Sequence, residues 1–150
     1  MEEFASRFLE RPGVILLSES RNKIVARDDE LAQAIGLEIQ PDLNLPDIIL
    51  VDLGSVDQLL VFVEVVATDG PVSESRRDSL MSVTTDAGFA ESQVAFVTAY
   101  ADRSHAAFKR SVSELAWRSF AWFMSEPDHI MVLRQGTATT MAKLSGLMNQ

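Results

Sequence analysis

Ile48-Ile49-Leu50-Val51 and Leu59-Leu60-Val61-Phe62-Val63 are two apolar runs separated by the turn sequence Leu53-Gly54-Ser55-Val56-Asp57. Each run has the length of a strand and is rich in branched side chains, which fit a pleated, buried surface. The glycine and the polar residues between the runs are typical of a short connection that reverses the chain. This segment therefore predicts two neighbouring antiparallel strands, around which the rest of the fold is arranged.

Three further apolar runs of strand length lie before and after this hairpin. They are Val14–Leu17, Val94–Val97 and Ile130–Leu133. Because their apolar residues are consecutive and do not alternate with polar ones, they predict strands that are covered on both faces. Together with the hairpin they indicate one largely buried sheet.

Segments with helical signals separate these strands. Asp28-Asp29-Glu30 precedes an apolar segment that stops at Gly36, and Ser73 precedes a second segment that ends near Gly88. A third predicted helix runs from about 102 to 117, with its apolar residues on one side. Helices that alternate with strands around a hairpin predict an α/β fold, a mixed sheet flanked by helices.

The composition limits both the domain count and the chemistry. A chain of 150 residues is expected to form one domain. The absence of cysteine excludes a thiolate zinc site and a cysteine nucleophile, and two histidines leave little imidazole for a metal. Any metal must then be held mainly by oxygen, which points to Mg²⁺. The polar, small-residue-rich tail over residues 135–150 is expected to be poorly ordered.

The charge and hydropathy patterns bear on location and partners. No apolar run is long enough to span a bilayer, and Met1-Glu2-Glu3 is acidic where a secretory signal is basic, so a cytoplasmic protein without a membrane segment is expected. The net charge of −9 argues against nucleic acid, because lysine and arginine drive phosphate binding. Most of the acidic excess falls in residues 1–60, so the second part of the chain is closer to neutral.

Two acids are placed where chemistry is expected. Asp47 opens the first hairpin strand, and Glu64 lies within the second. A carboxylate in so apolar a strand is costly to bury unless it is paired or bound to a metal, and two on adjacent strands can converge on one cation. Two structural alternatives stay open: Glu64 facing solvent from a half-exposed strand, and Asp47 serving as a turn residue after proline.

The sequence around these acids resembles that of a known protein family. The blocks are Asn44-Leu45-Pro46-Asp47-Ile48-Ile49-Leu50, Phe62-Val63-Glu64-Val65-Val66-Ala67-Thr68-Asp69-Gly70-Pro71-Val72, Ala95-Phe96-Val97-Thr98-Ala99-Tyr100 and Glu126-Pro127-Asp128-His129. In this order they are similar to the C-terminal catalytic domain of BsuBI/PstI-type restriction endonucleases, within the PD-(D/E)XK nuclease superfamily. The likeness covers the chain from about 4 to about 133.

The resemblance implies Mg²⁺-dependent hydrolysis of phosphodiester bonds in double-stranded DNA at a short palindromic site. It implies a restriction-endonuclease-like core in which Asp47 and Glu64 bind the metal and the main-chain carbonyl of Val65 is a third ligand. It also implies that residues 1–150 are the C-terminal part of a longer enzyme that acts as a homodimer. Two alternatives stay open: a repair or recombination nuclease with the same core, and a DNA-binding module whose site has decayed.

One departure from the family pattern concerns a lysine two positions after the second acid, where this chain has Val66. Lys23 is the favoured replacement, as a compact charge at a phosphate, and Arg76 or Arg77 is the alternative. A solvated surface lysine is an equally good interpretation of Lys23. Glu19 is a further candidate acid for the site.

Basic residues after the acidic first part are predicted to contact the DNA backbone. They are Arg76, Arg77, Lys109 and Arg110. The turn Asp69-Gly70-Pro71 followed by Ser73 has two interpretations: exposed main-chain N–H groups suited to a phosphate, or a plain strand-to-helix connection capped by the serine.

Overall fold

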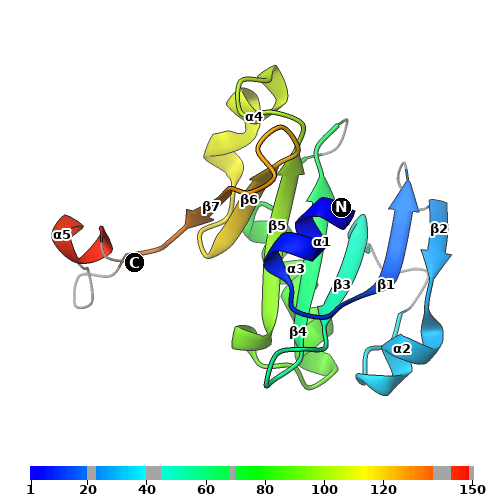
Figure 1. Ribbon diagram of the computed structural model, residues 1–150. Helices are drawn as coiled ribbons and strands as arrows, with labels where there is room; N and C mark the ends of the chain where they lie inside the picture. Colours follow the sequence, from blue (N-terminus) through cyan, green and yellow to red (C-terminus); the bar gives the residue numbers. More distant parts are fainter. Residues whose placement is uncertain (20–22, 40–44, 68–69, 137–142, 149–150) are drawn as a thin grey trace.

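The computed structural model describes residues 1–19, 23–39, 45–67, 70–136 and 143–148. In these ranges the strands form one seven-stranded sheet in the order β2-β1-β3-β4-β5-β6-β7 (Figure 1). They are β1 (Pro12–Glu19), β2 (Lys23–Arg27), β3 (Ile48–Asp52), β4 (Leu59–Val65), β5 (Val94–Tyr100), β6 (Ser119–Phe123) and β7 (Ile130–Leu133). The pairs β4–β5 and β5–β6 are parallel and the other neighbouring pairs are antiparallel. The predicted mixed α/β sheet is confirmed.

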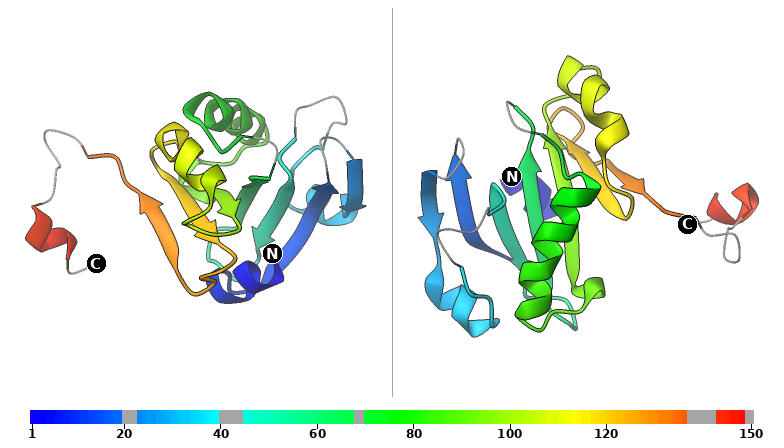
Figure 2. Two further views of the ribbon diagram at one scale, coloured as in Figure 1. Left: turned by 90° about the horizontal axis from the view of Figure 1, so that it is seen from above. Right: turned by 180° about the vertical axis from the view of Figure 1, so that it is seen from behind.

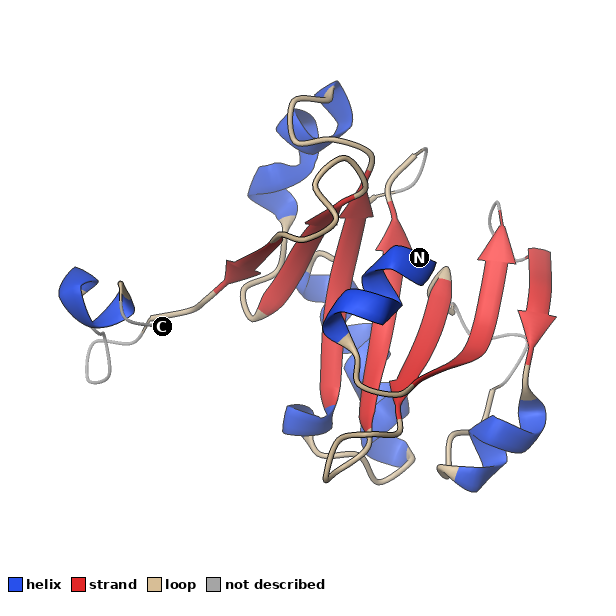
Figure 3. Cartoon of the chain, viewed as in Figure 1, coloured by secondary structure: helices blue, strands red, loops and turns tan. Residues whose placement is uncertain are grey.

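Helices cover both faces of the sheet. The helices of the described ranges are α1 (Glu2–Phe8), α2 (Asp29–Ala34), α3 (Glu74–Asp86), α4 (Ala106–Ser111) and α5 (Leu144–Leu147), with 3₁₀ turns at Glu91–Gln93 and Val112–Glu114, and α5 stands away from the sheet. Helices α3 and α4 lie on one face and α1 on the other (Figures 2 and 3). Phe62, Leu80 and Phe96 belong to the core on the α3 face, and Phe4 and Trp122 belong to the core on the α1 face.

The predicted hairpin is confirmed as the pair β3 and β4. All five residues of β3 are buried, and so are five of the seven residues of β4. The register pairs Ile48 with Val63 and Asp52 with Leu59, without a bulge. Because side chains alternate between the faces of a sheet, this register decides which residues of the two strands share a face.

The first two predicted helices are confirmed with their caps. Asp28 accepts a hydrogen bond from the third residue of α2, and Ser73 accepts one from the third residue of α3. Gly36 and Gly88 follow the two helices with φ angles of +82° and +89°, a conformation that side chains with a Cβ rarely adopt. Local chemistry therefore starts and stops both helices.

The third predicted helix, residues 102–117, is wrong in its extent, because α4 covers only Ala106–Ser111. The chain beyond the following 3₁₀ turn is held by distant main-chain partners. The Ala116 N–H donates to the Val72 carbonyl, and the Arg118 N–H donates to the Leu133 carbonyl. These bonds replace the hydrogen bonds that a longer helix would have made.

Besides α5, which falls in the C-terminal tail, three elements were not predicted from the sequence: α1, β2 and β6. All five residues of β2 are exposed, so this edge strand has no burial pattern to reveal it. The aromatic run of β6 directly follows the segment that was assigned to the overlong helix. For β2 and β6, pairing with the neighbouring strand, and not the local sequence, decides the structure.

The C-terminal tail was expected to be poorly ordered over residues 135–150. Within it, residues 137–142 and 149–150 lie outside the described residues, and α5 falls in the rest. None of the described helices combines the length and the apolar character that crossing a bilayer requires.

Asp52 is a buried acid at the turn end of the hairpin, where β3 ends. Its carboxylate accepts main-chain hydrogen bonds from Glu10 at 2.9 Å, from Arg11 at 2.9 Å and from Gly54 at 3.0 Å. Burial raises the pKa of Asp52, but these three N–H groups outweigh it and hold the pKa below its ordinary value of 3.8. The carboxylate thus ties the segment after α1 to the hairpin turn.

Replacing Asp52 by alanine is expected to lower the free energy of unfolding by about 2–4 kcal/mol, because three part-buried N–H groups lose a charged acceptor. Urea denaturation at pH 7 measures this loss. A lowered folded-state pKa contributes stability above the unfolded-state pKa, and this stability disappears as the pH falls through the folded value. The difference from the wild type should therefore shrink below about pH 4. A difference that stays constant on acidification contradicts the assignment.

Candidate active site

Asp47 and Glu64 meet on one face of the hairpin. The register pairs Ile48 with Val63, and its continuation by one residue sets Asp47 opposite Glu64. By alternation both acids share the face of Phe62, on which α3 packs. Directly opposed residues of antiparallel strands have Cβ atoms about 4.5–5.5 Å apart, so the two carboxyl groups lie within reach of one cation. The structure brings the two predicted acids together.

Asp47 is held by hydrogen bonds on both sides. Its Oδ2 accepts from the Val65 N–H at 2.7 Å, and its main-chain carbonyl accepts from the Ser18 N–H at 2.8 Å. The Ser18 hydroxyl donates to the same carbonyl at 3.1 Å. Strands β1 and β4 therefore both fix the position of the aspartate, which lies one residue before β3 begins.

Pro46 explains why the Val65 N–H donates to a side chain, that of Asp47, and not to a main-chain carbonyl. The Val66 N–H donates to the Ala99 carbonyl in β5. Because the main-chain N–H and C=O groups of successive strand residues point to opposite sides, those of Val65 point towards β3. The next partner of Val65 in the register is Pro46, which has no N–H to donate. The Val65 carbonyl consequently receives no ladder hydrogen bond from β3 and is suited to bind a cation beside Asp47.

Glu64 is a buried acid with a strongly shifted pKa. The residue is 7% exposed, and its Oε1 accepts a hydrogen bond from Arg76 Nε at 2.7 Å. Burial raises the pKa of Glu64 to about 7, with the carboxylate of Asp47 adding to the rise and the charge and hydrogen bond of Arg76 opposing it. Two neighbouring carboxylates repel each other when both are charged, so positive charge nearby favours the ionised form of Glu64.

Arg76 supplies that positive charge from the first turn of α3. Its Nε pairs with Glu64, and its Nη2 donates to the Leu45 carbonyl at 2.9 Å. One guanidinium thus joins α3, β4 and the segment before β3. Val66, at the position where the resemblance predicts a lysine, packs with the aromatic cluster of Tyr100 and Phe123.

Lys23 and Glu19 lie away from the acid pair. Lys23 is exposed at the start of edge strand β2 and pairs with Glu19 of β1, two strands from β3. Glu19 lies two residues after Leu17, which packs on the α1 face, so its side chain points to the same face. Lys23, its partner across the strand pair, shares that face, which is opposite the acid pair. The prediction that Lys23 projects towards the pair is corrected: the basic group found there is Arg76.

Arg77 is also corrected as a predicted DNA contact. Its side chain is only 6% exposed and donates to Glu91 at 2.7 Å. The guanidinium lies over the ring of Phe96, 5.3 Å from its centroid. A cation that is buried under α3 and already paired cannot reach a phosphate.

Lys109 and Arg110 remain available for nucleic acid. Both are exposed on α4, which lies on the same face of the sheet as α3 (Figure 2). Helix α4 follows the carboxyl end of β5, and β5 runs parallel to β4 with Thr98 beside Glu64. The basic residues of α4 therefore lie at the end of the sheet that holds the acid pair.

Thr98 positions this end of the sheet and was not identified from the sequence. It is fully buried, and its hydroxyl accepts from the Val72 N–H at 3.0 Å. This bond holds the connection that leads into α3, whose first turn carries Arg76. The sequence signal that could have identified Thr98 is a hydroxyl side chain within an otherwise apolar strand.

The predicted phosphate turn lies partly outside the described residues, since Asp69 is not among them. Ser73 caps α3, as the interpretation of a plain strand-to-helix connection expects.

Replacing Thr98 by valine, which has nearly the same shape, should lower the free energy of unfolding by about 1–3 kcal/mol, since the Val72 N–H loses its buried acceptor. Thermal or urea denaturation measures the loss. Thr85→Val, an exposed position on α3, is the matched control and should change stability by less than about 0.5 kcal/mol. Equal effects at the two positions would show that the Thr98 hydroxyl does not hold the connection.

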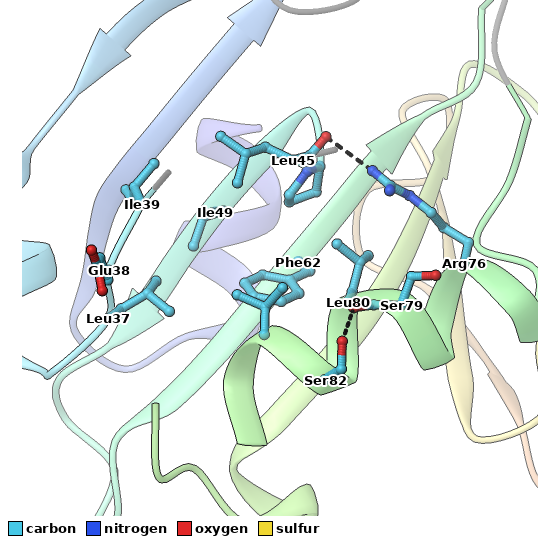
Figure 4. A pocket seen from close by; sticks show the side chains of 12 residues that line it. Leu37, Glu38, Ile39, Leu45, Ile49, Phe62, Arg76, Ser79, Leu80 and Ser82 are labelled. Atoms are coloured by element: carbon cyan, nitrogen blue, oxygen red, sulfur yellow. Dashed lines mark hydrogen bonds between the residues drawn. The ribbon is translucent and has the colours of Figure 1, made fainter. Parts of the chain in front are cut away.

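A cleft of about 220 Å³ opens beside Arg76 on this face of the sheet, and neither acid of the pair is among its lining residues (Figure 4). Leu45, Pro46 and Arg76 form part of its wall, and the remainder comes from residues 37–39, from Ile49 of β3 and Phe62 of β4, and from residues of α3 that include two serines. In the described ranges, no group of three acids or histidines is arranged for a metal. The metal ligands that this region offers are the two carboxylates and a main-chain carbonyl.

Comparisons with known proteins identify relatives of this arrangement. The sequence model of the BsuBI/PstI restriction endonuclease domain matches residues 1–136. Type II restriction enzyme BsuBI of Bacillus subtilis is 25% identical over 131 residues, covering 87% of this chain and 39% of the relative. Type II restriction enzyme AplI of Arthrospira platensis is 31% identical over 107 residues, covering 69% of this chain and 31% of the relative.

A solved structure, that of the SdaI restriction endonuclease, superposes with a TM-score of 0.73 at 28% identity. The match covers 95% of this chain and 42% of that protein. The chain thus spans less than half the length of each of these relatives.

Proposed function

This chain belongs to the BsuBI/PstI restriction endonuclease domain family, and from that premise we propose that it is a catalytic domain that hydrolyses phosphodiester bonds in double-stranded DNA with Mg²⁺. The observation that carries the proposal is the pair Asp47 and Glu64, opposed on two buried strands. For both carboxylates to be charged together, the pair needs more positive charge than the single guanidinium of Arg76 supplies. The family supplies the DNA substrate, and the acids supply the reason for a metal.

In this proposal Asp47, Glu64 and the carbonyl of Val65 hold the metal, an all-oxygen set of the kind that Mg²⁺ prefers. When bound there, the ion would supply a water molecule of lowered pKa and would polarise the phosphoryl oxygen. The Val65 N–H fixes the Asp47 carboxylate through its 2.7 Å hydrogen bond, so little reorganisation is needed when the ion arrives. Pro46 contributes by leaving the Val65 carbonyl without a ladder donor.

DNA is proposed to bind across the end of the sheet that carries the acid pair. Lys109 and Arg110 on α4 are the proposed backbone contacts, and Arg76 lies beside the acids. These residues give local positive charge to a chain whose net charge is −9. A palindromic target needs two symmetric copies, so the enzyme is proposed to act as a homodimer in the cytoplasm, with this chain as its C-terminal catalytic part.

Val66 favours one second candidate, a DNA-binding module that has lost catalysis. The family pattern has a lysine at this position, and here the side chain is packed among apolar residues. The two candidates differ in a single result: both bind DNA, but only the nuclease converts it to product.

The experiment is digestion of plasmid DNA by the purified chain, and by any longer protein that contains it, with Mg²⁺, with Ca²⁺ and with EDTA. We expect Mg²⁺-dependent conversion of supercoiled DNA to linear fragments at fixed positions. Binding of DNA in Ca²⁺ without cleavage in Mg²⁺ would favour the decayed module. Neither binding nor cleavage by the full-length protein would reject the proposed function.

A further inference from the structure

We propose that Arg76 is an exchangeable partner of Glu64: it neutralises this acid while the metal is absent, is displaced when a divalent cation binds, and then pairs with the scissile phosphate. The inference rests on the proposed function and deepens it. Arg76 would thereby take the part of the lysine that Val66 replaces.

The first argument is competition for one carboxylate group. Arg76 Nε donates to Glu64 Oε1 at 2.7 Å, and the two side chains are 17% and 10% exposed. A charge-assisted hydrogen bond of this length engages the carboxylate that would bind the metal. Because two cations at one carboxylate repel each other and share its negative charge, a metal ion on Glu64 lowers the strength of the guanidinium contact. Metal binding must therefore weaken the Arg76 contact.

The second argument is the place of Arg76 on its helix. It is the third residue of α3, three positions after the capping Ser73. The N-terminal end of a helix carries partial positive charge, so an arginine there is unfavourable unless an acid compensates it. Glu64 is that acid, and an arginine released from it lies beside an end of a helix that favours negative charge. A phosphate is the anion that the proposed substrate brings to this position.

The third argument is space. Arg76 lies in the wall of the 220 Å³ cleft, with its guanidinium directed towards the Leu45 carbonyl (Figure 4). The guanidinium has five N–H donors, so it can leave Glu64 through one group and keep the Leu45 carbonyl through another. By contrast, Arg77 is packed on Phe96 and has no such freedom. Adjacent arginines on the same helix thus have different environments.

A permanent structural clamp is the competing explanation, and metal affinity together with the state of the Arg76 Nε–H separates the two. If Arg76 exchanges with the metal, its removal strengthens metal binding and the metal releases its Nε–H in the wild type; if it only clamps α3 to β4, its Nε–H stays bound to Glu64 at saturating metal. Arg76→Gln removes the charge and keeps hydrogen-bonding groups. Arg7→Gln is the matched control, because Arg7 pairs with Asp128 and belongs to α1, on the opposite face of the sheet.

The test is a titration of each protein with Mn²⁺ and Mg²⁺ by isothermal calorimetry, without DNA. We expect Arg76→Gln to bind the ions about 3- to 10-fold more tightly than the wild type. We expect Arg7→Gln to match the wild type. Cleavage by Arg76→Gln should fall about 100-fold, with partial recovery in Arg76→Lys, which restores a positive charge without the planar fork.

A second measurement on the wild type does not depend on the folding of a variant. The Nε–H proton of Arg76 should be protected from solvent exchange in metal-free protein and lose that protection when Mg²⁺ is added, as followed by NMR. Metal binding with unchanged affinity in folded Arg76→Gln, or an Nε–H that stays protected at saturating Mg²⁺, overturns the exchange alone. Failure of the wild type to bind any divalent ion overturns the proposed function as well.

Discussion

Asp47→Asn is expected to reduce Mg²⁺-dependent DNA cleavage by about 1000-fold or more, equivalent to about 4 kcal/mol of transition-state stabilisation. The reason is electrostatic: the neutral amide can accept the Val65 hydrogen bond as the carboxylate does, but it cannot offer negative charge to a cation. The fold should therefore survive while the metal site is lost. Initial rates of plasmid cleavage over a range of Mg²⁺ concentrations measure the effect.

The hairpin itself provides a matched control for this substitution. Asp57 is exposed in the turn at the opposite end of β3 and β4, so Asp57→Asn removes the same charge far from Glu64. This variant should cleave like the wild type, and both variants should bind DNA in Ca²⁺. Near-normal cleavage by a folded Asp47→Asn protein would remove this residue from the proposed metal site.

Trp122→Ala is expected to lower the free energy of unfolding by about 3–5 kcal/mol, because it leaves a cavity under α1. Trp122 is 1% exposed and meets the ring of Phe4 edge-on at 5.6 Å between centroids. Its indole N–H donates to the Pro127 carbonyl at 3.1 Å, which closes the β6–β7 connection. Urea denaturation followed by circular dichroism measures the loss without relying on the fluorescence of the removed side chain.

Trp122→Phe separates packing from hydrogen bonding. The phenyl ring keeps an aromatic partner for Phe4 and loses the bond to Pro127, so most of the loss seen in Trp122→Ala should be recovered. Trp117, which is 53% exposed, serves as the control, and Trp117→Ala should cost less than about 1 kcal/mol. Similar losses at the two tryptophans would contradict the core on the α1 face.

The features predicted correctly from the sequence depend on residues that are near one another in the chain. The short turn between β3 and β4 leaves one register that buries both strands, and that register sets Asp47 opposite Glu64. The caps and glycines of α2 and α3 act on the turns that adjoin them. In such cases the physical cause lies within the segment, so the sequence alone was sufficient.

The features that the sequence left open depend on partners far away in the chain. Edge strand β2 exists because β1 pairs with it. Helix α4 ends at Ser111, and the chain after it is held by main-chain bonds from Ala116 to Val72 and from Arg118 to Leu133. Their own side chains carry no record of those partners, so local periodicity misplaced them.

The choice among Lys23, Arg76 and Arg77 also required the tertiary structure. Successive residues of a helix are turned by about 100°, so the rotation of α3 on the sheet directs one arginine to Glu64 and the next to Glu91. Leu80 and Thr84, buried under α3, settle that rotation through packing. The sequence determined that Asp47 and Glu64 lie opposite each other, because strand alternation and the hairpin register are local. Only long-range packing determined which cation reaches them, because the face that a helix buries depends on the surface it meets.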